Sequence, residues 1–228
     1  MAKVEVDKNK CIGCGECVNV CLCGANEVFG REVSPEDVMK EVLSDRIYYK
    51  TSGGGMTLSG GEPSMQADFA LTLIKMAKDE GIGTFIETCG IGARSFYEKA
   101  FDMGAAFLFD IKAIDSDKHK KLTGVSNDKI ISNLEYLFES GAEVIIRLLM
   151  VPGVNDDGDD IEKLCAFLRS HKGKYRYAEI MPYHSFGTAK AERLGRSDSY
   201  ISSDATADDK ERWRATFNCF GIDVKISE

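Results

Sequence analysis

The sequence predicts an α/β fold in which parallel strands alternate with helices. One theme recurs along the 228 residues: an amphipathic helix, a glycine and then a short apolar strand. This order is typical of right-handed βαβ units on a parallel sheet, which both an open doubly wound sheet and a barrel contain. Hydrophobic residues make up 43% and charged residues 29%, as in ordinary globular proteins. Either architecture would bring functional groups together beyond the carboxyl ends of the strands.

The predicted elements follow one another from residue 34 onwards. Ser34 and Pro35 begin the first helix as a cap and a proline at the first helical position, and the helix ends near Asp45. Several later helices end at a glycine, as at Gly81 and Gly141. We expect strands at 56–59, 84–87, 106–109, 143–149, 177–181 and 222–226, with helices at 65–80, 94–103, 127–140, 159–169 and 207–220.

Charge and hydropathy argue against two classes of partner. The net charge of -8 opposes binding to a phosphate backbone, which needs clustered lysine and arginine, so we expect no nucleic acid partner. The chain contains no apolar run of about 20 residues. Its first ten residues also lack the apolar core of a signal peptide. We therefore expect no membrane association and a cytoplasmic protein.

Five of the eight cysteines lie close together near the N-terminus, which indicates a metal site in a reducing compartment. Four of them have C-x2-C-x2-C-x3-C spacing, which is typical of a 4Fe-4S cluster: Cys11, Cys14, Cys17 and Cys21. Zinc is the alternative, although zinc sites usually pair two separated C-x2-C units. Leu22 follows Cys21 where proline is usual, and Cys23 is either a substitute ligand or a small residue beside the cluster.

A glycine pair and a carboxylate follow the strand at 56–59. Gly60 and Gly61 leave the backbone open to close approach, and Glu62 follows at once. Backbone carbonyls and a carboxylate suit the ammonium group of a zwitterion. A Gly-Gly sequence alone is more often only a turn, so this segment gains meaning from the other strand ends.

Polar residues follow or interrupt four further strands. Thr88 follows the second strand, and alternation puts Asp110 and Lys112 on one side of the third. Arg147 lies in an apolar run and needs an anionic partner, such as a ligand carboxylate. His184 follows the strand at 177–181, although a lone histidine is more often a surface residue. Five strand ends with polar groups favour one binding site.

These motifs together resemble the radical SAM superfamily, and most closely the glycyl radical enzyme activating enzymes. The resemblance covers nearly the whole chain. It depends on the cysteine run and on these segments: Gly30-Arg31-Glu32-Val33, Ser52-Gly53-Gly54-Gly55, Leu58-Ser59-Gly60-Gly61-Glu62-Pro63, Glu87-Thr88-Cys89-Gly90, Asp110-Ile111-Lys112, Leu122-Thr123-Gly124, Val151-Pro152-Gly153-Val154-Asn155-Asp156 and Pro182-Tyr183-His184.

The resemblance implies a fold, two cofactors and a reaction. The fold is a partial (β/α) TIM-like barrel that binds S-adenosylmethionine (SAM). A 4Fe-4S cluster reduces SAM to methionine and a 5'-deoxyadenosyl radical, which abstracts hydrogen from a glycine of a partner glycyl radical enzyme. Reduced flavodoxin or ferredoxin is the implied electron donor. Gly60, Gly61 and Glu62 would bind the amino group of SAM, and the rest of its pocket would include Thr88, Asp110, Lys112, Arg147 and His184.

The sequence departs from the family at the catalytic cysteines. The family motif is C-x3-C-x2-C, and here Gly24 stands where Cys17 and Cys21 would require a third cysteine. We therefore assign no catalytic residue and expect a chain that lacks its first barrel strand, with a ferredoxin-type segment at 1–30 and a partial barrel at 31–228. The strand at 56–59 would then lie at a sheet edge. The alternative is a non-catalytic iron-sulfur module for electron transfer or partner binding.

Overall fold

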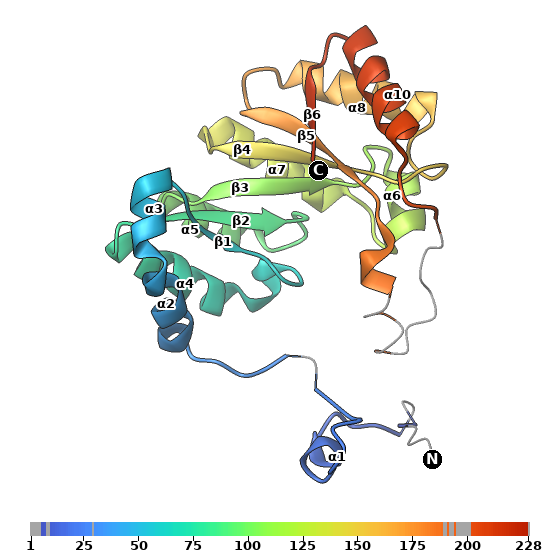
Figure 1. Cartoon of the computed structure of the whole chain (residues 1–228). Coiled ribbons are helices and arrows are strands. Elements are labelled where there is room, and N and C mark those ends of the chain that lie inside the picture. The colour runs from blue at the N-terminus through green and yellow to red at the C-terminus, as the bar shows by residue number, and fades with distance from the viewer. Residues whose placement is uncertain are drawn as a thin grey trace.

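The computed structural model describes residues 6–7, 10–28, 30–188, 191, 194 and 202–227. Six parallel strands form one sheet in the order β1 to β6 (Figure 1). The strands are β1 (Gly55–Leu58), β2 (Gly83–Thr88), β3 (Ala106–Ile111), β4 (Val144–Met150), β5 (Tyr177–Pro182) and β6 (Val224–Ile226). All six predicted strands are confirmed. Because β1 and β6 do not pair in the described sheet, it is a partial barrel, and β1 lies at its edge as expected.

Three of the described helices precede β1, and the others connect successive strands. The helices are α1 (Glu16–Asn19), α2 (Pro35–Ser44), α3 (Arg46–Ser52), α4 (Ala67–Asp79), α5 (Arg94–Asp102), α6 (Ser116–Thr123), α7 (Asp128–Ser140), α8 (Gly158–Ser170) and α10 (Ala207–Cys219). Two 3-10 turns, η1 (Pro63–Gln66) and η2 (Ser185–Gly187), follow β1 and β5. Among the described helices, none is both long and apolar enough to cross a membrane.

Local sequence signals explain several helix ends. The Ser34 hydroxyl accepts a hydrogen bond from the Asp37 amide at the start of α2, as the cap prediction requires. Thr206 and Asp209 form a reciprocal capping box on α10. The helix predicted at 65–80 is shorter, because η1 occupies its first two residues. Three short helices, α1, α3 and α6, were not predicted from the sequence.

One face of the sheet packs against the connecting helices. Phe107, Phe109 and Ile146 are fully buried and belong to one apolar cluster with Leu134 of α7 and Trp213 of α10. Alternation along the strands sends their neighbours to the opposite face. That face carries Glu87, Asp110 and Arg147, so the sheet has an apolar helix side and a polar open side.

The N-terminal cysteine segment lies apart from the sheet. Figure 1 shows α1 at the far end of an extended stretch that leads to α2. The described cysteines of this segment are mostly exposed. The predicted division between residues 1–30 and 31–228 stays a prediction.

Candidate functional site

A cavity of about 240 Å³ lies at the carboxyl ends of β1, β2 and β3. Its lining includes six of the eight residues predicted to bind SAM: Gly60, Gly61, Glu62, Thr88, Asp110 and Lys112. Parallel strands explain this convergence, because their carboxyl ends share one edge of the sheet. Glu87 and Cys89 complete the polar lining together with Ser59.

Glu62 joins the loop after β1 to the end of β2. Its Oε1 accepts hydrogen bonds from the Ser64 amide at 3.2 Å, the Ser64 hydroxyl at 2.7 Å and the Thr88 hydroxyl at 2.8 Å. Its Oε2 accepts one from the Cys89 amide at 2.8 Å. Burial disfavours the carboxylate, but the hydrogen bonds from Cys89, Ser64 and Thr88 outweigh burial and lower the pKa of Glu62. The side chain is therefore an ionised carboxylate that orders its own loop.

Thr88 and Tyr97 form a chain of hydrogen bonds that ends at Glu62. Thr88 is 2% exposed, and its only proton goes to Glu62. The Tyr97 hydroxyl, 3.1 Å away, therefore donates to the Thr88 oxygen. Gly92 donates its amide to Tyr97 at 3.2 Å. The sequence alone does not single out Tyr97, because its position on α5 marks it only as part of a buried stripe.

Four charged side chains form a chain across β2, β3 and β4. Arg147 Nη1 lies 2.7 Å from Glu87 Oε1, and its Nε lies 3.6 Å from Asp110 Oδ1. Lys112 Nζ lies 3.7 Å from Asp110 Oδ2. The strand register explains the central contact, since Asp110 and Arg147 are direct partners. Arg147 thus has two anionic partners within the protein, Glu87 and Asp110, and its role toward a ligand stays a prediction.

Asp110 is in an environment that opposes ionisation. Burial raises the pKa of Asp110, the charges of Lys112 and Arg147 lower it, and Glu87 raises it further, with a net upward shift. Glu62 and Asp110 thus have pKa values displaced in opposite directions within one cavity.

The other two predicted residues, Arg147 and His184, line a second cavity of about 470 Å³ at the ends of β4 and β5. Lys210 of α10 also lines it. The His184 ring lies beside the Phe186 ring in a tilted arrangement, with ring centroids 4.5 Å apart. Arg147 links the two cavities, because its ion-pair partners Glu87 and Asp110 line the first.

The predicted cluster ligands do not converge. Cys11, Cys14 and Cys17 are exposed, and no described group of three or more His, Cys, Asp or Glu residues is arranged to hold a metal ion. The Sγ of Cys21 accepts a hydrogen bond from the Ala25 amide at 3.2 Å, and backbone N–H groups of Asn26 and Ala25 lower the pKa of that thiol. Four thiols in one short segment with N–H donors at a sulfur fit an iron-sulfur cluster chemically, and the four ligands stay a prediction.

Comparisons with known proteins give the family. Residues 9–168 match the model of the Radical SAM superfamily. The choline trimethylamine-lyase activating enzyme of Oleidesulfovibrio alaskensis is 38% identical over 98% of this chain and 84% of its own length. The trans-4-hydroxy-L-proline dehydratase activating enzyme of Clostridioides difficile is 41% identical over 84% of this chain and 74% of its own. The pyruvate formate-lyase-activating enzyme of Staphylococcus aureus is 36% identical, over 86% and 79% respectively.

Solved structures agree on the fold. A domain of pyruvate-formate lyase-activating enzyme from Bacteroides vulgatus has a TM-score of 0.63 at 22% identity, over 77% of this chain and 99% of that one. Radical SAM proteins use a 4Fe-4S cluster and SAM, and the predicted resemblance is confirmed. The chain belongs to the Radical SAM superfamily, among the glycyl radical enzyme activating enzymes.

Proposed function

We propose that this chain binds SAM at the carboxyl ends of its strands and activates a glycyl radical enzyme. A 4Fe-4S cluster, when bound and reduced, would supply the electron for cleavage of SAM to methionine and a 5'-deoxyadenosyl radical, and that radical would take a hydrogen atom from a glycine of the partner. The related enzymes are named as activating enzymes of several lyases and a dehydratase, which supports a protein substrate of this class.

The first cavity supplies groups of both charges for the methionine part of SAM. Gly60 and Gly61 leave backbone carbonyls open to a ligand ammonium, and the nearby Glu62 carboxylate favours that positive charge. Lys112 is the cation available for the ligand carboxylate, since its ammonium makes only a long contact of 3.7 Å with Asp110. This pairing of charges is the single observation that carries the proposal.

The second cavity would receive the adenosyl part of SAM. Arg147 and His184 line it from β4 and from the residue after β5. In this proposal the cysteines Cys11, Cys14, Cys17 and Cys21 hold a cluster that receives electrons from reduced flavodoxin or ferredoxin in the cytoplasm.

The proposal is tested by SAM binding and cleavage after anaerobic reconstitution with iron and sulfide. We expect SAM binding in calorimetry and formation of 5'-deoxyadenosine with a chemical reductant. Lys112→Ala should weaken SAM binding about tenfold, because a charge-assisted hydrogen bond is lost. Lys129→Ala, at an exposed lysine of α7, is the matched control. Equal SAM affinities for Lys112→Ala and wild type would remove the proposed site.

A non-catalytic iron-sulfur module is the second candidate. The absence of C-x3-C-x2-C from the sequence favours it. Such a module would incorporate iron and accept an electron but ignore SAM. Separate measurements of cluster reduction and SAM affinity on one reconstituted sample distinguish the two functions. Cys14→Ala, with the exposed Cys219→Ala as control, tests the cluster ligands by iron content alone.

A further inference from the structure

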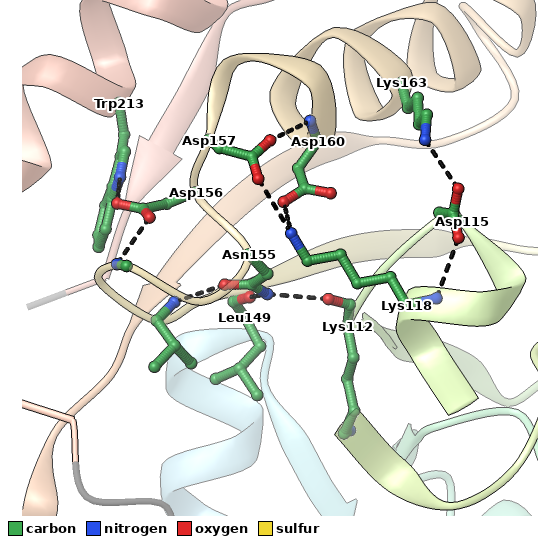
Figure 2. A network of polar contacts seen from close by, with 12 residues as sticks. Lys112, Asp115, Lys118, Leu149, Asn155, Asp156, Asp157, Asp160, Lys163 and Trp213 are labelled. Atoms are coloured by element: carbon green, nitrogen blue, oxygen red, sulfur yellow. Dashed lines mark hydrogen bonds and ion pairs between the residues drawn. The ribbon is translucent and has the colours of Figure 1, made fainter. Parts of the chain in front are cut away.

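The Asn155 side chain forms hydrogen bonds to the backbone at the ends of both β3 and β4. It is 4% exposed, and its Nδ2 donates hydrogen bonds to the carbonyl oxygens of Lys112 at 2.8 Å and Leu149 at 2.6 Å. Its Oδ1 accepts one from the Val151 amide at 2.7 Å. Figure 2 shows this amide between the two chain segments. Both amide protons and the amide oxygen are therefore used inside the protein.

The amide group stands where the sheet ladder stops. The last register pair of β3 and β4 is Ile111 with Leu148. Lys112 and Leu149 come next, and their carbonyl groups share the Asn155 amide as their donor. The Asn155 side chain thus continues the hydrogen bonding between β3 and β4 one residue beyond their last register pair. It supplies a donor to two backbone carbonyl groups at that point.

The two residues whose carbonyl groups accept from Asn155 line different cavities. Lys112 lines the first cavity and Leu149 lines the second, whereas Asn155 lines neither of them. In Figure 2 the Lys112 side chain runs away from Asn155, so that only its carbonyl faces the amide. Asn155 would therefore affect a ligand in the first cavity through the Lys112 backbone, to which it is hydrogen-bonded.

An outer layer of ion pairs keeps the same two loops together. Lys163 of α8 lies 2.7 Å from Asp115, which begins α6. Lys118 of α6 contacts Asp157 at 3.2 Å and also Asp160, both at the start of α8. The loops after β3 and β4 thus form one unit, inside which the Asn155 amide is enclosed.

We propose that Asn155 is a positioning residue for Lys112, which rests on the proposed function of Lys112 in binding the ligand carboxylate. Asn155 holds the Lys112 carbonyl and so fixes the direction in which that residue leaves β3. The ammonium group is then kept over the first cavity, near Asp110, before a ligand arrives. Pre-organisation of this kind raises affinity because the bound side chain loses less freedom.

Two substitutions separate the donors from the acceptor. Asn155→Ala removes all three hydrogen bonds. Asn155→Asp keeps the shape and the acceptor for Val151 but turns a carboxylate towards two carbonyl oxygens. We expect each to weaken SAM binding to the reconstituted protein about tenfold at neutral pH. Leu134→Ala, at a fully buried core position outside both cavities, controls for loss of stability alone.

A double-mutant cycle with Lys112→Ala tests whether Asn155 acts through Lys112. In a Lys112→Ala background, Asn155→Ala should change SAM affinity by less than about twofold, because the ammonium group that Asn155 positions is absent. Hydrogen exchange at the Val151 amide, measured without SAM, should quicken in Asn155→Ala and serves as a binding-independent reading.

The outcomes separate this inference from the proposed function. Equal losses from Asn155→Ala in both backgrounds, or no loss in either, would overturn the positioning role while Lys112→Ala still weakens binding. A wild-type protein that binds no SAM would instead overturn the proposed function, and this inference with it.

Discussion

Asp115 and Asp157 form a reciprocal pair: each caps the helix that follows its own strand and accepts a lysine from the other's helix. Asp115 accepts the Lys118 amide at 3.0 Å to begin α6, and Asp157 accepts the Asp160 amide at 2.9 Å to begin α8. Lys163 of α8 then donates to Asp115, and Lys118 of α6 donates to Asp157. The two loops beside the candidate site are therefore fastened twice, once at each helix start (Figure 2).

The first prediction concerns the acid sensitivity of this pair. The hydrogen bond from Lys163, with that from the Lys118 amide, lowers the pKa of Asp115 to about 2. Because the folded pKa lies below the unfolded value of about 4, Asp115 stabilises the fold above that pH, and the contribution is lost as the pH falls towards 2. The gap in unfolding free energy between wild type and Asp115→Asn should narrow over that range.

The measurement is urea unfolding at a series of pH values. Asp79→Asn, at an exposed aspartate that ends α4, is the matched control and should show no such trend. If the difference in unfolding free energy between wild type and Asp115→Asn stays constant from about pH 5 to about pH 2, that result would contradict the ion pair.

Arg147 provides the second prediction. Its side chain is 16% exposed and separates the carboxylates of Glu87 and Asp110. Arg147→Met should destabilise the fold by about 2 kcal/mol, because it leaves two partly buried like charges without their common partner. Glu87→Gln in the same chain should restore part of that loss. A double-mutant cycle by chemical denaturation measures the coupling, and strict additivity would argue against the ion pair.

The third prediction separates two roles of Glu62. Glu62→Gln keeps the shape of the side chain, but its amide nitrogen must face either the Cys89 amide or the Ser64 amide, and both are N–H donors. The expected cost is about 1–3 kcal/mol in unfolding free energy. Loss of stability without SAM would identify Glu62 as the residue that orders its loop.

Thermal unfolding of the ligand-free protein measures this cost. Glu135→Gln, at an exposed position of α7, should leave the midpoint unchanged. Should Glu62→Gln weaken SAM binding while the unfolding midpoint stays at the wild-type value, the carboxylate would act on the ligand alone.

The sequence predicted the sheet because its signals are local. Glycines end the helices, and apolar runs such as 144–150 fill a strand that is covered on its helix side. It missed α1, α3 and α6 because helices of eight residues or fewer show weak periodicity. Asp115 three residues before Lys118 and Gly124 at the far end were the available signals for α6.

The partners of the site residues could not be read from the sequence. Strand alternation predicted that Asp110 and Lys112 share a side, and they do. No local pattern indicates that Tyr97 donates to Thr88, since these residues meet only when α5 packs under β2. Asn155 is a similar case, because its three hydrogen bonds join segments up to 43 residues apart.

The last prediction concerns a close approach at the start of β1. A Cβ atom added to Gly55 would lie 2.0 Å from the backbone oxygen of Gly83, its register partner on β2. Backbone cannot yield as a flexible side chain can, so Gly55→Ala should force β1 away from β2 and cost about 1–3 kcal/mol.

The neighbouring glycine is the matched control. A Cβ added to Gly54 would meet only the Ser52 hydroxyl, at 3.0 Å, and that side chain can rotate away. Gly54→Ala should therefore be tolerated, whereas Gly55→Ala should lower the unfolding midpoint and quicken hydrogen exchange at Thr57. Because β1 leads directly into Gly60 and Gly61, Gly55→Ala should also weaken SAM binding. Equal midpoints for the two variants would show that β1 does not pair with β2 in this register.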